Sequence, residues 1–107
     1  MKKDNIVVFV TVSGNKEAKK ISEYLVGKKL AACVSIIPKI SSIYWWKGKI
    51  EKSKELLLVV KTKKSIFQKL IREVKKLHSY TVPEIISLPI TGGNKDYLKW
   101  ININTKI

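Results

Sequence analysis

The sequence predicts an α+β fold with the order strand, helix, strand, strand, helix, strand and a short C-terminal helix. Three observations support it: a valine-rich apolar run opens the chain, two segments carry apolar residues at helical spacing, and some thirty central residues form two long strands around one tight turn. This order is typical of a ferredoxin-like sandwich, in which both helices cover the same face of the sheet.

The first strand is predicted over Asn5–Ser13, and its continuous apolar character indicates a central strand buried on both faces. Gly14 and Asn15 interrupt this pattern, and Asn15 is the residue we expect to cap the helix that follows. Gly27 is the expected end of that helix. The apolar face of the helix consists of Ala18, Ile21, Ser22 and Leu25.

The long central hairpin is predicted to turn at Lys47-Gly48, where glycine supplies a positive φ. A two-residue turn pairs Trp46 with Lys49. Strands of five or six residues are usual, whereas each of these strands spans about fifteen. Such a ribbon is too long for one small domain to cover.

Both faces of the ribbon are expected to be apolar. If no bulge intervenes, Ile36 faces Val59 on one side of the sheet and Ile37 faces Leu58 on the other. Two helices bury only one side, and large exposed apolar patches are rare on soluble monomers. We therefore expect a closed homo-oligomer. The aromatic residues 44–46 at the tip fit an interface, although they also fit a role in capping their own sheet.

The second helix is predicted from a capping-box pattern formed by Ser65 and Gln68. Its apolar positions are Ile66, Phe67, Leu70, Ile71, Val74 and Leu77. A last strand is expected over 84–90, where Pro89 favours an edge position. The final helix should start at Asn94 and present Tyr97, Leu98 and Trp100.

Length and composition favour a single domain over residues 1–107 in a reducing cytoplasm. The chain has one cysteine, Cys33, which forms no internal disulfide and lacks the paired spacing of a zinc site. The apolar stretch 6–12 is shorter than a usual signal-peptide core, and no spanning segment follows, so no membrane partner is expected.

The formal net charge of +14 raises the question of nucleic-acid binding. The 22 positive residues are 21 lysines and Arg72, and they are spread over the whole chain. Arginine is the residue favoured for phosphate and base recognition. A lysine-rich solubilising surface is therefore the preferred interpretation, with a basic nucleic-acid-binding protein as an alternative.

No catalytic machinery is visible. The sequence offers no nucleophile and base pair and no glycine-rich phosphate loop, since Gly92-Gly93 alone is a weak signal. Acid and base chemistry would have to use the single histidine, His78, with Glu84 or Tyr80. We expect a protein that is not an enzyme.

Three polar residues remain candidates for binding. His78 could hold a metal with a carboxylate, although a histidine at a helix C-terminus also complements the helix dipole. Cys33 is either a ligand or a small buried residue. Lys61 follows an apolar run where the strand should be buried, and it would need an anionic ligand or a carboxylate such as Glu84 unless it extends out to solvent.

Four segments together resemble the CutA family of divalent-cation tolerance proteins. They are AACVSIIPKISSIYWWKGKIEK, VVKTKKS, HSYTVPEIISLPI and GNKDYLKWI, and they span nearly the whole chain in order. The resemblance implies a ferredoxin-like subunit in a homotrimer similar to the PII signalling proteins. It also implies a response to metal ions, with Cu²⁺ or another divalent cation as the bound species.

The resemblance also implies where a ligand would bind. The family pattern H-P-Y-x-x-P-E is matched by His78, Tyr80, Pro83 and Glu84, while Ser79 replaces the first proline. The residues that map onto the cleft between subunits are Cys33, Lys61, His78, Tyr80 and Glu84.

Other family ligand positions are altered. Val10 and Leu77 occupy two positions where metal-binding interpretations of the family place a cysteine and a second histidine. The candidate metal ligands are thus His78 and Cys33, and copper needs several such donors. The leading interpretation is a cytoplasmic homotrimer for divalent-cation tolerance. The main alternative is a PII-like module that binds an anionic metabolite through Lys61.

Overall fold

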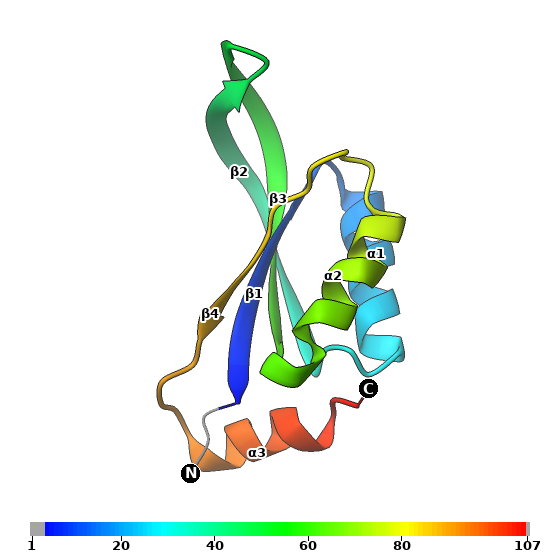
Figure 1. The fold of residues 1–107 in the computed structure, drawn as a ribbon, viewed down its shortest axis with the longest axis vertical. Helices are drawn as coiled ribbons and strands as arrows, with labels where there is room; N and C mark the ends of the chain where they lie inside the picture. Colours follow the sequence, from blue (N-terminus) through cyan, green and yellow to red (C-terminus); the bar gives the residue numbers. More distant parts are fainter. Residues whose placement is uncertain (1–3, 107) are drawn as a thin grey trace.

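The computed structural model describes residues 4–106 (Figure 1). The elements are β1 (Asn5–Val12), α1 (Asn15–Gly27), β2 (Cys33–Trp46), β3 (Lys49–Lys63), the short 3₁₀ turn η1 (Lys64–Ile66), α2 (Phe67–Leu77), β4 (Ile85–Pro89) and α3 (Lys95–Ile103). The strands form one antiparallel sheet in the order β2-β3-β1-β4. The predicted fold class is confirmed, with β1 in the interior of the sheet and the proline-containing β4 at its edge.

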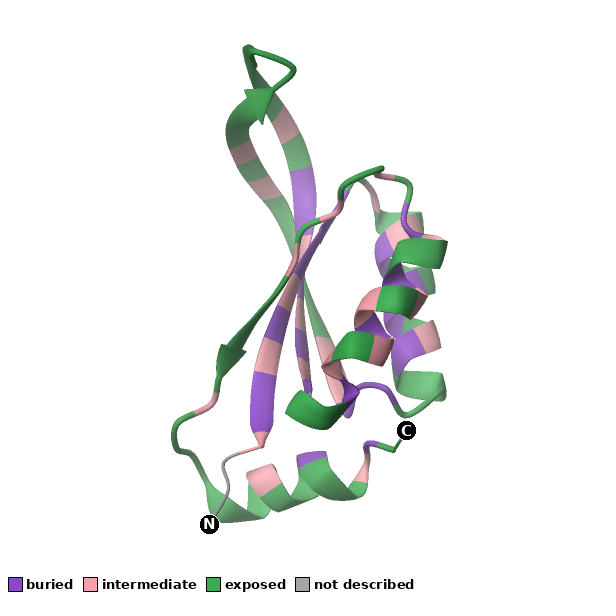
Figure 2. Ribbon diagram, viewed as in Figure 1, coloured by how far each residue is buried: buried purple, intermediate pink, exposed green. Residues whose placement is uncertain are grey.

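The core lies between one face of the sheet and the pair α1 and α2. Figure 1 shows both helices on the same side of the sheet, and α3 across its lower end. Val8 and Val10 of β1, like Leu58 and Val60 of β3, are completely buried against these helices. The buried face of α1 is the predicted set of Ala18, Ile21, Ser22 and Leu25. In Figure 2 the buried residues gather on these facing surfaces, whereas the ribbon tip is exposed.

Two of the three predicted helix starts are wrong in detail. Gly14, not Asn15, is the N-cap of α1; its backbone is extended, but glycine has no side chain to accept a capping hydrogen bond. Ser65 lies inside the 3₁₀ turn before α2, so the capping box with Gln68 does not form. A capping side chain needs an extended backbone just before the helix. Asn94 meets that condition at α3, where its side-chain oxygen accepts a hydrogen bond from the Asp96 N–H at 2.9 Å.

The ribbon turns at Lys47-Gly48 as predicted, and Trp46 pairs with Lys49. Both turn residues have positive φ, 51° and 78°, which is the geometry of the type I′ turn that suits the twist of two-stranded ribbons.

A β-bulge changes the predicted register farther along the ribbon. Ile36 pairs with Leu58 and Ile37 with Leu57, because the register shifts by one residue between Ile37 and Ile40. Pro38 lies in this interval and has no N–H for the ladder, and Lys39 adopts a φ of 60°. The predicted pairing of Ile36 with Val59 and of Ile37 with Leu58 is therefore wrong.

The second face of the sheet, called the open face below, is covered by neither α1 nor α2. Directly paired residues share a face, so the register places Phe9, Val59 and Leu57 together on it. Its exposed apolar side chains include Ile37, Ile86 and Leu88, with 45%, 50% and 43% of their surface accessible. None of the helices within residues 4–106 has both the length and the apolar content of a membrane span.

Candidate functional site

Two polar clusters lie at different ends of the open face, and the first surrounds Lys61. Cys33 of β2 pairs with Lys61 of β3. The Lys61 Nζ donates a hydrogen bond to the Ser35 hydroxyl at 3.0 Å and lies 4.0 Å from the Cys33 sulfur. Within the described chain, no carboxylate is close enough to Lys61 to form an ion pair. The cluster therefore presents an ammonium group and a thiol without a counter-charge.

Tyr97 of α3 completes this first cluster. Burial is the main cause that raises the pKa of the Tyr97 hydroxyl, and the neighbouring Cys33 sulfur adds to the effect electrostatically and through a hydrogen bond. These causes favour the neutral phenol, since burial and a nearby acceptor disfavour the anion. The cluster of Cys33, Ser35, Lys61 and Tyr97 is called the lysine cluster below.

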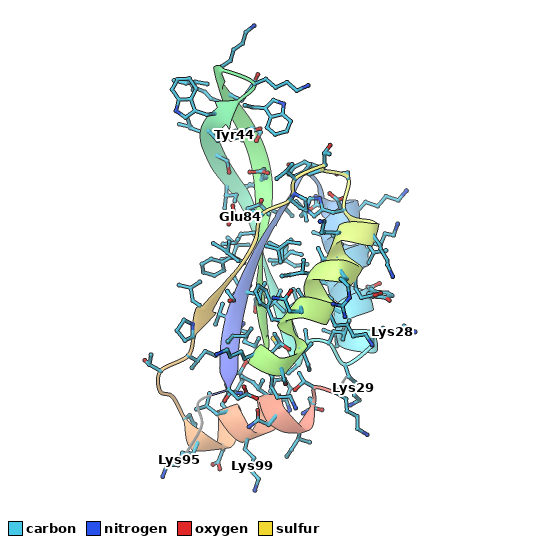
Figure 3. All side chains as sticks on the ribbon, viewed as in Figure 1. Lys28, Lys29, Tyr44, Glu84, Lys95 and Lys99 are labelled. Atoms are coloured by element: carbon cyan, nitrogen blue, oxygen red, sulfur yellow. The ribbon has the colours of Figure 1, made fainter. Side chains whose placement is uncertain are left out.

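The second cluster lines a cavity of about 760 Å³ between the ribbon and the loop that joins α2 to β4. The ribbon contributes residues 42–46 and the loop contributes residues 79–82 and 84. In Figure 3 the labelled Tyr44 lies on the ribbon, and the labelled Glu84 lies lower, where the chain enters β4. The cavity is lined by Thr11, Ser42, Ile43, Tyr44, Trp45, Trp46, Glu55, Ser79, Tyr80, Thr81, Val82 and Glu84.

Glu55 and Tyr80 form a short hydrogen bond in this cavity. The Tyr80 hydroxyl donates to a Glu55 carboxylate oxygen at 2.6 Å. Burial first, and then this hydrogen bond and the negative charge of Glu55, raise the pKa of Tyr80 well above its ordinary value. The phenol is held as a neutral donor to Glu55, a residue that is only 6% exposed.

His78 fixes the loop at the edge of the cavity. Its Nε2 donates to the Thr11 carbonyl at 2.7 Å, and its Nδ1 accepts from the Tyr80 N–H at 3.0 Å. Since a backbone carbonyl only accepts and a backbone N–H only donates, these contacts define the neutral Nε2–H tautomer. Both ring nitrogens are thus occupied, and neither is available to a metal in this arrangement.

Glu17 of α1 holds the same loop from the other side. Its carboxylate accepts from the Ser79 N–H at 2.6 Å and from the Ser79 hydroxyl at 3.1 Å. Burial acts to raise the pKa of Glu17, but the hydrogen bonds from Ser79, with a further one from the Ser13 backbone, outweigh it and lower the pKa. Glu17 therefore remains ionised and anchors the loop.

The structure separates the predicted site residues into these two groups. Tyr80 and Glu84 line the cavity beside His78, whereas Cys33 and Lys61 belong to the lysine cluster. Lys61 pairs with Val7, and His78 contacts Thr11, four residues farther along β1, which is about 13 Å in a strand. Glu84, offered as one candidate partner of Lys61, forms no ion pair with it within the described chain, since Ile85 beside it pairs with Val10, three residues from Val7. Residues 4–106 contain no group of three or more histidine, cysteine or acidic side chains able to hold a metal.

Three functional candidates were missed by the sequence interpretation: Glu55, Thr11 and Glu17. Glu55 had a usable signal, because it bounds the apolar run of β3 at one end as Lys61 bounds it at the other. The two residues are an even number of positions apart and so share a face. Glu17 carried no such signal, since its contact with Ser79 joins residues far apart in the sequence.

The sheet order, the two helices on one face and the long ribbon define a ferredoxin-like α+β protein. The family model described as "CutA1 divalent ion tolerance protein" matches residues 6–104. The chain belongs to this CutA1 family.

Individual relatives agree with this assignment. The divalent-cation tolerance protein CutA of Thermus thermophilus is 50% identical over 99 residues, which cover 92% of this chain and 96% of the relative. The chloroplastic protein CutA 1 of Oryza sativa subsp. japonica is 46% identical over 102 residues, or 95% of this chain. The chain spans only 58% of that plant relative's length.

A solved structure supports the fold. The divalent cation tolerance protein Cut A1 from Thermus thermophilus superposes with a TM-score of 0.94 at 49% sequence identity. The match covers 95% of this chain and 99% of the other.

Proposed function

We propose that this protein acts in divalent-cation tolerance as a homotrimer that is not an enzyme. The observation that carries the assembly is the open face, where Ile37, Ile86 and Leu88 are exposed on one side of the sheet. Burying apolar surface is the main driving force of association, so further copies of the chain are the expected cover. The number of three subunits follows from the resemblance to the CutA family.

The metal would bind between subunits rather than within one. Cys33 and His78 lie too far apart in a single chain to share a metal ion, since ligand bonds are about 2 Å long. The thiol of Cys33 is partly exposed on the open face. Copper binding would therefore depend on donors that neighbouring copies bring to the Cys33 thiol.

A copper titration followed by calorimetry tests this metal proposal. Saturable binding by the native protein should be weakened by Cys33→Ser, because a thiol is a stronger copper ligand than a hydroxyl. Ser35→Ala is the matched control, since Ser35 lies in the same cluster but has no sulfur. If the native protein binds no copper, or if native protein and both variants bind it equally, Cys33 is not a copper ligand.

A second candidate function is supported by Lys61. Its ammonium group has a hydroxyl at 3.0 Å and no carboxylate partner among the described residues. A small anionic metabolite would supply the negative charge that Lys61 lacks. The protein would then act in signalling. Stabilisation by ATP or inorganic phosphate in a thermal-shift measurement should disappear in Lys61→Met and persist in Lys52→Met. Equal loss in both variants would indicate general attraction to a cationic protein.

We propose a cytoplasmic location on the basis of the single free thiol, which suits a reducing compartment. The name of the rice relative places that protein in the chloroplast. Fractionation of the source cells with an antibody against this chain would test the location, and recovery in another compartment would contradict it.

A further inference from the structure

Positive charge gathers where the first two turns of α1 meet the last two turns of α2. The Glu17 carboxylate on α1 accepts two hydrogen bonds from Ser79, just after α2, so these two helix ends lie side by side (Figure 1). Six cationic side chains belong to these turns, and all of them are exposed. They are called the helix patch below: Lys16, Lys19, Lys20, Arg72, Lys75 and Lys76.

The two acidic side chains of these turns do not neutralise the helix patch. Glu17 accepts its hydrogen bonds from Ser79, and Glu73 accepts one from the Tyr24 hydroxyl at 2.5 Å. Glu73 also forms an ion pair with Lys76 at 3.2 Å. The other five cations of the patch form no ion pair within residues 4–106. Most of the patch therefore keeps its positive charge without a counter-charge.

The spacing of these cations works against helix stability. Lys16 and Lys20 are four residues apart on α1, and Arg72 and Lys76 are four residues apart on α2. Like charges at this spacing lie on the same helix face and destabilise the helix. Charges of mixed sign at the same positions would keep the protein soluble without this repulsion. The pattern therefore suits a surface that meets an external anion.

We propose that the helix patch binds double-stranded nucleic acid through its phosphate backbone, without reading its sequence. Each lysine that neutralises a phosphate releases condensed counterions, and this gain depends on charge rather than on the planar fork of arginine. Base recognition favours arginine, and Arg72 is the single arginine of the patch. Because α1 and α2 cover the side of the sheet opposite the open face, the inference does not depend on the proposed trimer or on copper binding by Cys33.

The side chains around the patch disfavour two other anionic partners. Within residues 13–23 and 68–79, no apolar or aromatic side chain is exposed. Single-stranded nucleic acid gains much of its affinity from stacking on aromatic rings, and helices that lie on membranes insert apolar side chains. A duplex presents its phosphates outward and needs only positive charge opposite them.

Fluorescence anisotropy of a labelled DNA duplex of about 24 base pairs tests the proposal. The native protein should bind this duplex saturably at about 50 mM potassium chloride, and it should bind a second duplex of unrelated sequence equally. An RNA duplex of the same length should also bind, because its backbone carries the same phosphates. Affinity should fall as salt rises, with a slope on logarithmic axes of about 0.9 for each DNA phosphate contacted.

Matched double variants locate the binding surface. Lys16→Gln with Lys20→Gln should weaken duplex binding about tenfold or more at low salt and reduce the salt slope by about two. Lys95→Gln with Lys99→Gln removes the same charge from α3, where both lysines are exposed at the lower end of the molecule (Figure 3). This control should keep the native salt slope and lose much less affinity. Circular dichroism checks that both variants are folded.

Three results would overturn the proposal. The first is no saturable binding of either duplex at low salt, as expected if the lysines only keep the protein soluble. The second is an equal loss of affinity in the two double variants, which would indicate general attraction by the net charge. The third is preference for a single strand of the same length, or binding to phosphatidylserine vesicles but not to duplexes.

Discussion

Tyr80 shows at the scale of one residue how the loop after α2 is stabilised. It donates its hydroxyl to Glu55 and its backbone N–H to His78, and its ring lies 4.7 Å from the His78 ring. The contact with Glu55 joins the loop to β3, and His78 in turn joins it to the Thr11 carbonyl of β1, so the position of Glu84 at the cavity depends on both.

The hydroxyl of Tyr80 should make a measurable contribution to stability. Tyr80→Phe leaves the buried Glu55 carboxylate without its donor, which we expect to cost about 1–3 kcal/mol in the free energy of unfolding. Urea denaturation at a fixed protein concentration measures this change. Tyr24→Phe removes a hydroxyl from the less deeply buried contact with Glu73 and should cost much less. Equal losses of unfolding free energy in the two variants would mean that burial of Glu55 does not strengthen its contact with Tyr80.

Glu17 should make stability depend on pH. Its pKa is lower in the folded protein than its ordinary value of 4.5, so the ionised form is favoured by folding. This stabilisation is present above the unfolded-state pKa and is lost as the pH falls through the folded-state pKa. Glu17→Gln should therefore destabilise the protein at pH 7, and the difference should shrink below pH 4.5. Denaturation curves that differ equally at pH 7 and pH 3 would contradict this assignment.

The residue-level contacts were the least predictable from sequence. His78, Tyr80 and Glu84 could be singled out from their types and order, but the loop that carries them is held by Thr11, Glu55 and Glu17, which are distant in the chain. Pairing of this kind depends on the folded arrangement of α1, β1 and β3. The sequence likewise offered Glu84 as one candidate partner of Lys61, and no ion pair joins the two within the described chain.

At the scale of an element, sequence patterns predicted the turn of the ribbon but not its bulge. Its turn at Lys47-Gly48 was predictable, because a glycine between two long apolar strands is a local signal. The bulge was not predicted, since it depends on how Pro38 and Lys39 fit against Leu56 rather than on hydrophobic spacing. A shift of one residue then moved every pair between the bulge and Cys33.

Replacing Lys39 in the bulge by glycine should stabilise the ribbon. Lys39 has a φ of 60°, a conformation that costs a non-glycine residue roughly 1 kcal/mol. We expect Lys39→Gly to raise the free energy of unfolding by about 0.5–1 kcal/mol. Lys52→Gly, in regular strand geometry on the same ribbon, should lower it. Destabilisation by both substitutions would show that the left-handed backbone of Lys39 carries no cost.

The charge of the whole molecule should weaken its stability at low salt. With a net charge of +14, the folded protein concentrates like charges, and salt screens their repulsion. Sodium chloride raised from 10 mM to 300 mM should increase the melting temperature by about 4 °C or more, the shift that corresponds to 1 kcal/mol in a domain of this size. Sucrose at equal osmolality is the control for excluded-solute effects. A fall in melting temperature with salt would mean that attractive ion pairs dominate.

The proposed assembly is the whole-molecule property that the sequence analysis predicted from the fewest residues. Two apolar faces on one ribbon predicted a covered surface, and the register error left that conclusion intact because Ile36 and Ile37 still lie on opposite faces and are both exposed. The pattern did not show that β4 adds Ile86 and Leu88 to the same surface, which required the order of the strands.

Light scattering on the purified protein at micromolar concentration tests the proposed assembly. The proposal predicts a mass three times the subunit mass of 12.2 kDa, reduced toward the subunit mass by Leu88→Lys on the open face. Val26→Lys is the matched control, since Val26 is equally exposed at 43% but lies on α1, and it should leave the mass unchanged. A mass of 12.2 kDa for the native protein, or equal effects of both substitutions, would contradict the proposed role of the open face.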